Sequence, residues 1–103
     1  MQVEDYLPIG SVVLVKGTPK TLMIISRAIK AAQGGHEKFF DYGACLYPEG
    51  IMGDQAMYFN NENIEEIVWR GFENDEEMRT QKILKEAVKM LDLEKADIKP
   101  LEI

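Results

Sequence analysis

Short apolar runs, each closed by glycine, proline or asparagine, fill most of the first 70 residues of this chain. Such runs are too short for typical globular helices, and their β-branched and aromatic side chains favour strands. Turn-forming residues between them mark connections at the surface. The sequence therefore predicts a sheet of short strands before any helix begins.

Five of these runs are predicted to be strands. The first two form an antiparallel hairpin around the turn Thr18-Pro19-Lys20, because both are rich in β-branched residues and similar in length. A polar connection over 33–37 leads to the third, in which Gly43 indicates a bulge or a close backbone approach. A single helical turn over about 61–64 precedes the last. The predicted strands are 11–15, 21–27, 38–47, 56–59 and 65–70.

One helix is predicted, from Asn74 to about Leu91. Asn74 or Asp75 can cap its N-terminus, and acidic residues follow in the first turn, where the helix dipole favours anions. Its apolar residues recur at helical spacing and are expected to face the core, while Met78 and Met90 at the edges could contact a partner helix. The core-facing stripe consists of Leu84, Ala87, Val88 and Leu91.

The length of 103 residues fits one domain. We expect a single α+β domain over 1–93, followed by a flexible tail over 94–103. The fold class is a small antiparallel five-stranded sheet, or an SH3-like barrel, followed by a C-terminal amphipathic helix. Closure into a barrel would remove the sheet edges, and the sequence does not choose between the closed and the open form.

The charge is distributed unevenly along the chain. Residues 1–40 hold five basic and three acidic residues, residues 41–103 hold seven basic and fifteen acidic ones, and the formal net charge is −6. Nucleic-acid-binding proteins usually present a basic face to the phosphates, so we expect no nucleic-acid partner. The small basic cluster of the first hairpin, which consists of Lys16, Lys20, Arg27 and Lys30, does not outweigh the acidic excess.

The chain holds one cysteine and one histidine, which excludes an internal disulfide and metal sites rich in either residue. Cys45 would need a nearby base to act as a nucleophile, but it lies in an apolar run whereas His36 lies in a polar connection. The carboxylates Asp41, Glu49 and Asp54 match no metal-binding spacing and are expected to solvate loop ends. Because nucleotide-binding and nucleophile motifs are also missing, we expect no enzyme activity, no cofactor and no metal.

Membrane association is not expected. No apolar run reaches the ~18–20 residues of a membrane span. The first ten residues contain acidic side chains where a signal peptide would begin with basic and apolar ones. We therefore expect a cytoplasmic protein.

Aromatic residues are frequent between positions 39 and 69. Strand alternation buries about half of such residues and leaves the others at the surface, where Tyr and Trp are common interface anchors. We therefore expect a protein-binding surface there. Its predicted residues are Tyr42, Tyr47, Tyr58 and Trp69, with Glu65 and Glu66 beside them.

Three stretches of the chain carry a family resemblance. In order along the chain, they resemble the bacterial domain-of-unknown-function family 4176 over about residues 7–72. The middle stretch is the most specific, whereas the turn at 18–20 departs from the glycine- and lysine-rich turn of the family, and the helix is not covered. The stretches are 7–17 with 22–25, Phe40-Asp41-Tyr42-Gly43-Ala44-Cys45-Leu46-Tyr47-Pro48-Glu49-Gly50, and Tyr58-Phe59-Asn60 ahead of 64–67 and Gly71-Phe72.

The resemblance implies a context more than a mechanism. Members of the family are found in Gram-positive bacteria, often beside genes for LXG-domain toxins exported by type VII secretion, and no catalytic residues are assigned to it. This implies a non-enzymatic cytoplasmic accessory protein that binds a partner protein, such as an LXG-domain toxin, as a chaperone or targeting adaptor. The alternative is an immunity protein that neutralises a toxin through its acidic surface. An edge strand or the helix could also pair two copies into a homo-oligomer.

Overall fold

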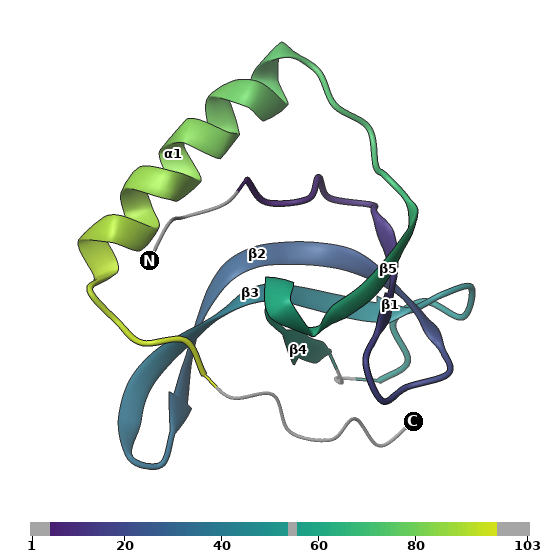
Figure 1. Cartoon of the computed structure of the whole chain (residues 1–103), viewed down its shortest axis with the longest axis horizontal. Helices are drawn as coiled ribbons and strands as arrows, with labels where there is room; N and C mark the ends of the chain where they lie inside the picture. Colours follow the sequence, from purple (N-terminus) through teal and green to yellow (C-terminus); the bar gives the residue numbers. More distant parts are fainter. Residues whose placement is uncertain (1–4, 54–55, 97–103) are drawn as a thin grey trace.

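The strands form one curved, open antiparallel sheet, and the helix lies over one side of it (Figure 1). The computed structural model describes residues 5–53 and 56–96. In this part of the chain the strands follow the order β4-β3-β2-β1-β5, so the two edge strands do not pair. The predicted α+β class is confirmed, and of its two forms the open sheet is correct and the closed barrel is wrong. The elements are β1 (Val12–Val15), β2 (Thr21–Gln33), β3 (His36–Leu46), β4 (Met57–Phe59), the 3-10 turn η1 (Asn61–Asn63), β5 (Ile64–Trp69) and α1 (Asp75–Leu91).

The hairpin of β2 and β3 is longer than predicted. Regular pairing continues to Gln33 and resumes at His36, so the connection predicted over 33–37 shrinks to a turn at Gly34 and Gly35. Both glycines have positive φ angles, 61° and 79°, which a two-residue hairpin turn requires and glycine adopts without strain. The sequence predicted only the first half of β2, because the alanine and polar side chains of the second half carry no strand signal.

Gly43 marks a point of close packing within this hairpin. A register shift in the pairing of β2 with β3 falls beside it, between Ile24 and Ser26. A Cβ atom at Gly43 would lie 2.3 Å from Ser26 Oγ and 2.7 Å from Ile29 Cδ1. The predicted close approach is therefore present, and a strand irregularity accompanies it.

The core lies between the sheet and the N-terminal segment that precedes β1. Tyr6 and Leu7 of this segment are buried against apolar side chains of four strands. Leu84 and Val88 of α1 pack on the same cluster, as their spacing predicted, but Ala87 is exposed. The strand residues of the core cluster are Val13, Val15, Leu22, Ile24, Tyr42, Ala44 and Phe59.

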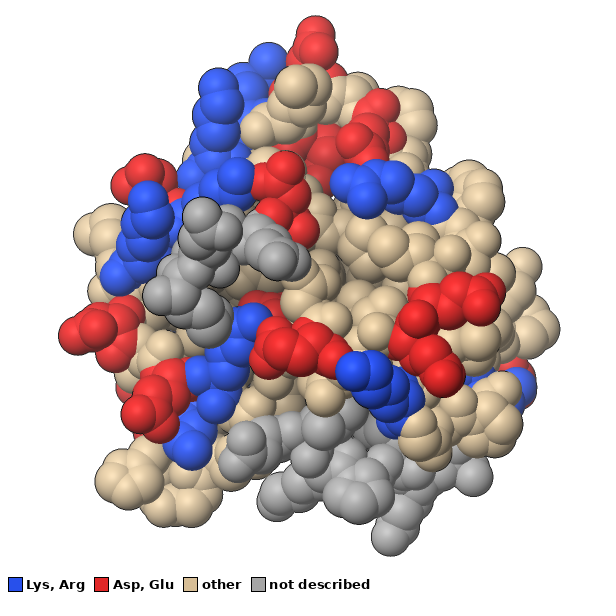
Figure 2. Space-filling model, in the orientation of Figure 1, with Lys and Arg blue, Asp and Glu red and all other residues tan. Residues whose placement is uncertain are grey.

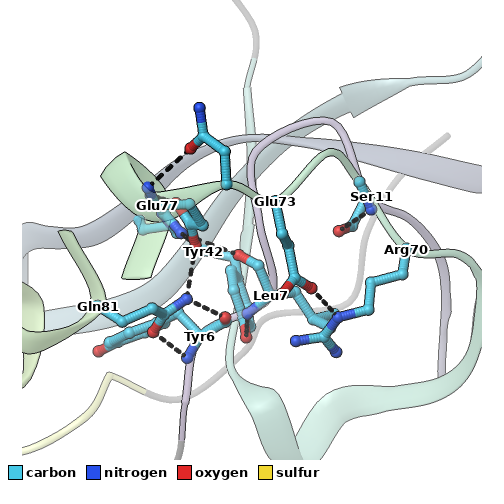
Figure 3. A network of polar contacts seen from close by, with 11 residues as sticks. Tyr6, Leu7, Ser11, Tyr42, Arg70, Glu73, Glu77 and Gln81 are labelled. Carbon is cyan, nitrogen blue, oxygen red and sulfur yellow. Dashed lines mark hydrogen bonds and ion pairs between the residues drawn. The ribbon is translucent and has the colours of Figure 1, made fainter. Parts of the chain in front are cut away.

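A polar network attaches α1 to the N-terminal segment and to β2 (Figure 3). Arg27 donates two hydrogen bonds to the Glu77 carboxylate, at 2.7 and 3.0 Å, and both side chains are largely buried. These bonds hold the pKa of Glu77 below its usual value, against the opposing effect of burial. The Gln81 side chain bonds both the N–H and the C=O group of Tyr6. The orientation of α1 therefore depends on polar contacts as well as on its apolar stripe.

Residues 94–96, which the sequence assigns to a flexible tail, belong to the fold. They pair in parallel with Phe39 of β3, whose main chain exchanges hydrogen bonds with theirs. Lys95 donates a hydrogen bond of 2.6 Å to the buried carboxylate of Asp41. The sequence prediction missed this contact because its two partners are far apart along the chain. The rest of the predicted tail, 97–103, lies outside the described residues.

Candidate protein-binding groove

The edge strand β5 follows β1 irregularly. Four residues of β1 pair with a six-residue strand, and Val68 and Glu65 are the extra residues at two bulges. A bulge interrupts the alternation of side chains, so the neighbours Val68 and Trp69 both line one groove. Bulges also twist an edge strand, which hinders its pairing with other sheets. The irregularity of β5 therefore hinders main-chain pairing at this edge and brings two neighbouring side chains to the groove.

The groove lies on the sheet face opposite the core. Trp69, Val12 and Met23 are successive cross-strand partners on β5, β1 and β2, so their side chains share one face. In the next row, Val13 and Leu22 point to the other face and are fully buried in the core. The groove has a volume of about 390 Å³, a size at which proteins hold small ligands or single large side chains. Its lining residues are Gly10, Val12, Met23, Tyr47, Val68 and Trp69.

Large apolar side chains around the groove remain at the surface. Trp69 is 60% exposed and Tyr47 is 47% exposed, although both line an otherwise apolar hollow. Ile9 and Phe72, which adjoin Gly10 and Gly71 in the sequence, are also exposed. Exposed apolar surface that forms a patch marks interaction sites in soluble proteins.

Two of the predicted aromatic residues lie elsewhere. Tyr42 is fully buried, so its place in the predicted binding surface is wrong; its hydroxyl accepts a hydrogen bond from the Leu7 N–H and donates one to Asn61. Burial raises the pKa of Tyr42 to about 12, and the hydroxyl therefore remains a neutral donor. Tyr58 is exposed, but it lies on the opposite edge strand, β4, with its ring stacked on Phe40.

The predicted acidic residues Glu65 and Glu66 are both exposed on β5, the strand that supplies Val68 and Trp69. Neither forms an ion pair with any residue in the described part of the chain. Their charges are therefore available to a basic group of a partner. The sequence reasoning missed Val68 as a groove residue, because no local signal indicates a bulge there.

The basic cluster of the first hairpin does not form a free cationic surface. Lys20 pairs with Glu49 at 2.5 Å, and Lys30 pairs with Glu37 at 3.4 Å. The guanidinium of Arg27 is occupied by Glu77, as described above. Three of the four basic side chains are thus neutralised within the chain, which disfavours contacts with phosphates.

Asp41 lies at the centre of a buried polar cluster rather than at a solvated loop end, so the prediction for this residue is wrong. Its carboxylate accepts hydrogen bonds from the Tyr6 hydroxyl at 3.3 Å and from the Asn61 N–H at 2.9 Å, besides the one from Lys95. Burial opposes the charge of Lys95, but hydrogen bonds to Asp41 and Glu62 outweigh it and raise the pKa of Lys95. An amine that acts as a nucleophile needs a lowered pKa. The raised pKa of Lys95 instead suits an ion pair that joins residues 94–96 to β3.

The other candidate chemical groups are not brought together. Cys45 is buried near one end of β3, whereas His36 is exposed at the other end, roughly 30 Å away along the strand. Within residues 5–53 and 56–96, no three His, Cys, Asp or Glu side chains gather as a metal site would require. Asp54, one of the carboxylates considered above, lies outside the described residues. No helix in the described part is both long and apolar enough to cross a membrane.

The fold and the groove define a small, single-sheet α+β protein with an apolar surface hollow beside a bulged edge strand. The family model of Domain of unknown function (DUF4176) matches residues 6–80, from the N-terminal segment into α1. The chain therefore belongs to this family, as the sequence resemblance indicated. No curated protein and no solved structure matches it with significant similarity.

Proposed function

We propose that this chain is a non-enzymatic, cytoplasmic accessory protein that binds another protein of a type VII toxin locus, as a chaperone or targeting adaptor. The observation that carries the binding role is the apolar groove with Tyr47 and Trp69 at its sides. The locus follows from the family resemblance, and the binding role follows from the surface.

The groove suits a bulky apolar side chain of a protein partner. Trp and Tyr supply large contact areas at a low entropy cost and dominate the binding energy of many interfaces. Glu65 and Glu66 add unpaired negative charge on the same strand. The expected partner segment therefore carries a large apolar residue with Lys or Arg near it.

A catalytic role receives no comparable support. The cysteine and the histidine lie at opposite ends of β3, and the buried ionisable cluster is internally hydrogen-bonded. In the described residues, every buried side-chain N and O atom has a hydrogen-bond partner.

The test is to measure binding of the LXG-domain protein encoded beside this chain. Trp69 is the single tryptophan, so its fluorescence reports on the groove directly, and burial by a partner should shift the emission to shorter wavelength. Calorimetry should show that Trp69→Ala and Tyr47→Ala each weaken binding, by about 30-fold for Trp69→Ala if it is a hot spot. Met78→Ala, which removes an equally exposed side chain from α1, should leave the affinity unchanged.

Undiminished affinity in both groove variants, with normal folding, would contradict the proposal. Truncation of the partner then distinguishes the two roles: binding to the N-terminal LXG domain supports an adaptor, and binding to the C-terminal toxin domain supports an immunity protein. The surface favours the adaptor, because acidic and basic side chains adjoin on the face in Figure 2 instead of forming one acidic region. An immunity protein that acts by charge should also bind more slowly as salt increases.

A further inference from the structure

Helix α1 carries a second apolar stripe that faces away from the molecule. Ile83 is 66% exposed and Met90 is 83% exposed, and Ala87 between them is exposed as well. Their spacing of four and three residues places them on one side of the helix. The neighbouring residues Leu84 and Val88, about 100° further round the helix, are the ones that pack on the core.

The contacts that hold α1 lie on the core side and leave this stripe uncovered. Glu77 and Gln81 bond Arg27 and Tyr6, and Lys85 forms an ion pair with Asp5. In the described part of the chain, neither Arg79 nor Glu86, which flank the stripe, forms an ion pair. Because two-thirds of the Ile83 surface is in water, burial of this side chain contributes little to the stability of the monomer.

We propose that this stripe binds the same stripe of a second copy of the chain, with the two α1 helices antiparallel. Thr80 and Ala87 lie about one helical turn to either side of Ile83, three residues before it and four residues after it. In an antiparallel pair Ile83 therefore meets its own copy, and Thr80 of each helix lies beside Ala87 of the other. An interface in which one patch contacts itself is the usual form of a twofold dimer.

The charges favour this antiparallel arrangement. Arg79 and Glu86 are seven residues apart, so they lie on the same flank of the stripe. In an antiparallel pair centred on Ile83, each Arg79 lies level with Ala87 of the other copy, one residue from Glu86, and its long side chain reaches that carboxylate, which gives two equivalent ion pairs. In a parallel pair these flanks would lie on opposite sides of the interface, so neither ion pair would form. The acidic first turn of each helix also approaches Lys89 in the last turn of the other. Figure 2 shows basic side chains gathered along α1.

The dimer is distinct from the proposed partner groove. The stripe lies on α1, and the groove lies on β1, β2 and β5, so dimerisation does not require groove residues. A single pair of 17-residue helices forms a small interface, and we therefore expect weak, concentration-dependent association.

Analytical ultracentrifugation of the whole chain over a wide concentration range tests the proposal. The wild type should show a reversible monomer–dimer equilibrium that Ile83→Glu abolishes, whereas Met78→Glu, on another side of the helix, should leave it unchanged. Glu86→Arg should weaken dimerisation by roughly tenfold, and the double variant Arg79→Glu/Glu86→Arg should restore it, because the pairs are then exchanged. Circular dichroism verifies that each variant is folded.

Cysteine crosslinking tests the register independently. Ile83→Cys should form a disulfide between two copies on mild oxidation, because the symmetry axis brings this position against itself. Met78→Cys provides the matched control, and the native Cys45 is buried in both. A chain that stays monomeric at the highest concentration, or a dimer that survives Ile83→Glu, would overturn the proposal; the second result would assign the dimer to another surface.

Discussion

The two faces of the sheet differ in what covers them. On one face, Tyr42 and Phe59 are fully buried beneath the N-terminal segment and α1, and polar atoms at the margins are hydrogen-bonded. On the other face, Trp69 and Tyr47 border an open apolar groove. The same types of side chain therefore stabilise the fold on one face and remain available to a partner on the other.

The difference follows from the covering segments rather than from the strands. The N-terminal segment places Tyr6 and Leu7 on the core face, and residues 94–96 pair with Phe39 of β3. On the groove face, the side chains of Ser26, Ile29 and Tyr58 pack around Gly43, which lies near β4 and away from the groove. Composition of the strands alone would not distinguish the faces. Four variants test the contrast, and they are arranged here from the largest expected effect to the smallest.

Phe59→Ala should destabilise the protein most, by about 3–5 kcal/mol, because it leaves a cavity under Tyr42 where no segment can collapse. Urea unfolding followed by circular dichroism measures this loss. If the loss were below about 1 kcal/mol, the core face would not be the more tightly packed one.

Glu77→Gln should destabilise the protein by about 2–3 kcal/mol, since it leaves Arg27 largely buried without its counter-charge. The pKa of Glu77 is lowered by folding from the usual 4.5, so its contribution is full above that pH and is lost as the pH falls through the folded value. As the pH is lowered from 7 to 3, the midpoint temperature of thermal unfolding should therefore fall less steeply in the variant than in the wild type. The exposed neighbour provides the control: Glu76→Gln should follow the wild type.

Gly43→Ala should lower the free energy of unfolding by about 1–3 kcal/mol, because the new methyl group meets Ser26 Oγ and Ile29 Cδ1. The double variant Gly43→Ala/Ser26→Ala should recover part of the loss, since the nearer of the two atoms is removed. A double-mutant cycle in urea measures this coupling. Additive effects would show that the two positions do not meet.

Trp69→Ala should change stability least, by less than about 1 kcal/mol, because more than half of the side chain is already in water. Its effect on partner binding should be far larger than its effect on unfolding. A loss of stability as large as that of Phe59→Ala would show that the groove residues serve the fold instead of a partner.

Much of the fold could be predicted because its signals are local. The β-branched runs, the turn at 18–20 and the cap at Asn74 each depend on neighbouring residues, and apart from the longer β2 the structure has these elements within a few residues of their predicted bounds. The errors lie where distant segments meet. Strand alternation predicts Tyr42 at the surface. This prediction is wrong because β3 is buried on both faces over most of its length. Of the predicted binding residues, Tyr47 and Trp69 border the groove, and Val68 was missed because of a bulge.

The sequence by itself determined the order and type of the elements, the helix over 75–91 and the membership of the family, since these depend on periodicity, capping and local motifs. Only the tertiary structure decided which face of the sheet is covered, that Lys95 is paired with Asp41, and that Ile83 faces outward while Leu84 faces inward. The physical reason is that burial depends on contacts between residues far apart in the chain. A strand's pattern shows that it has two faces, but the segment that crosses the sheet decides which of them becomes the core.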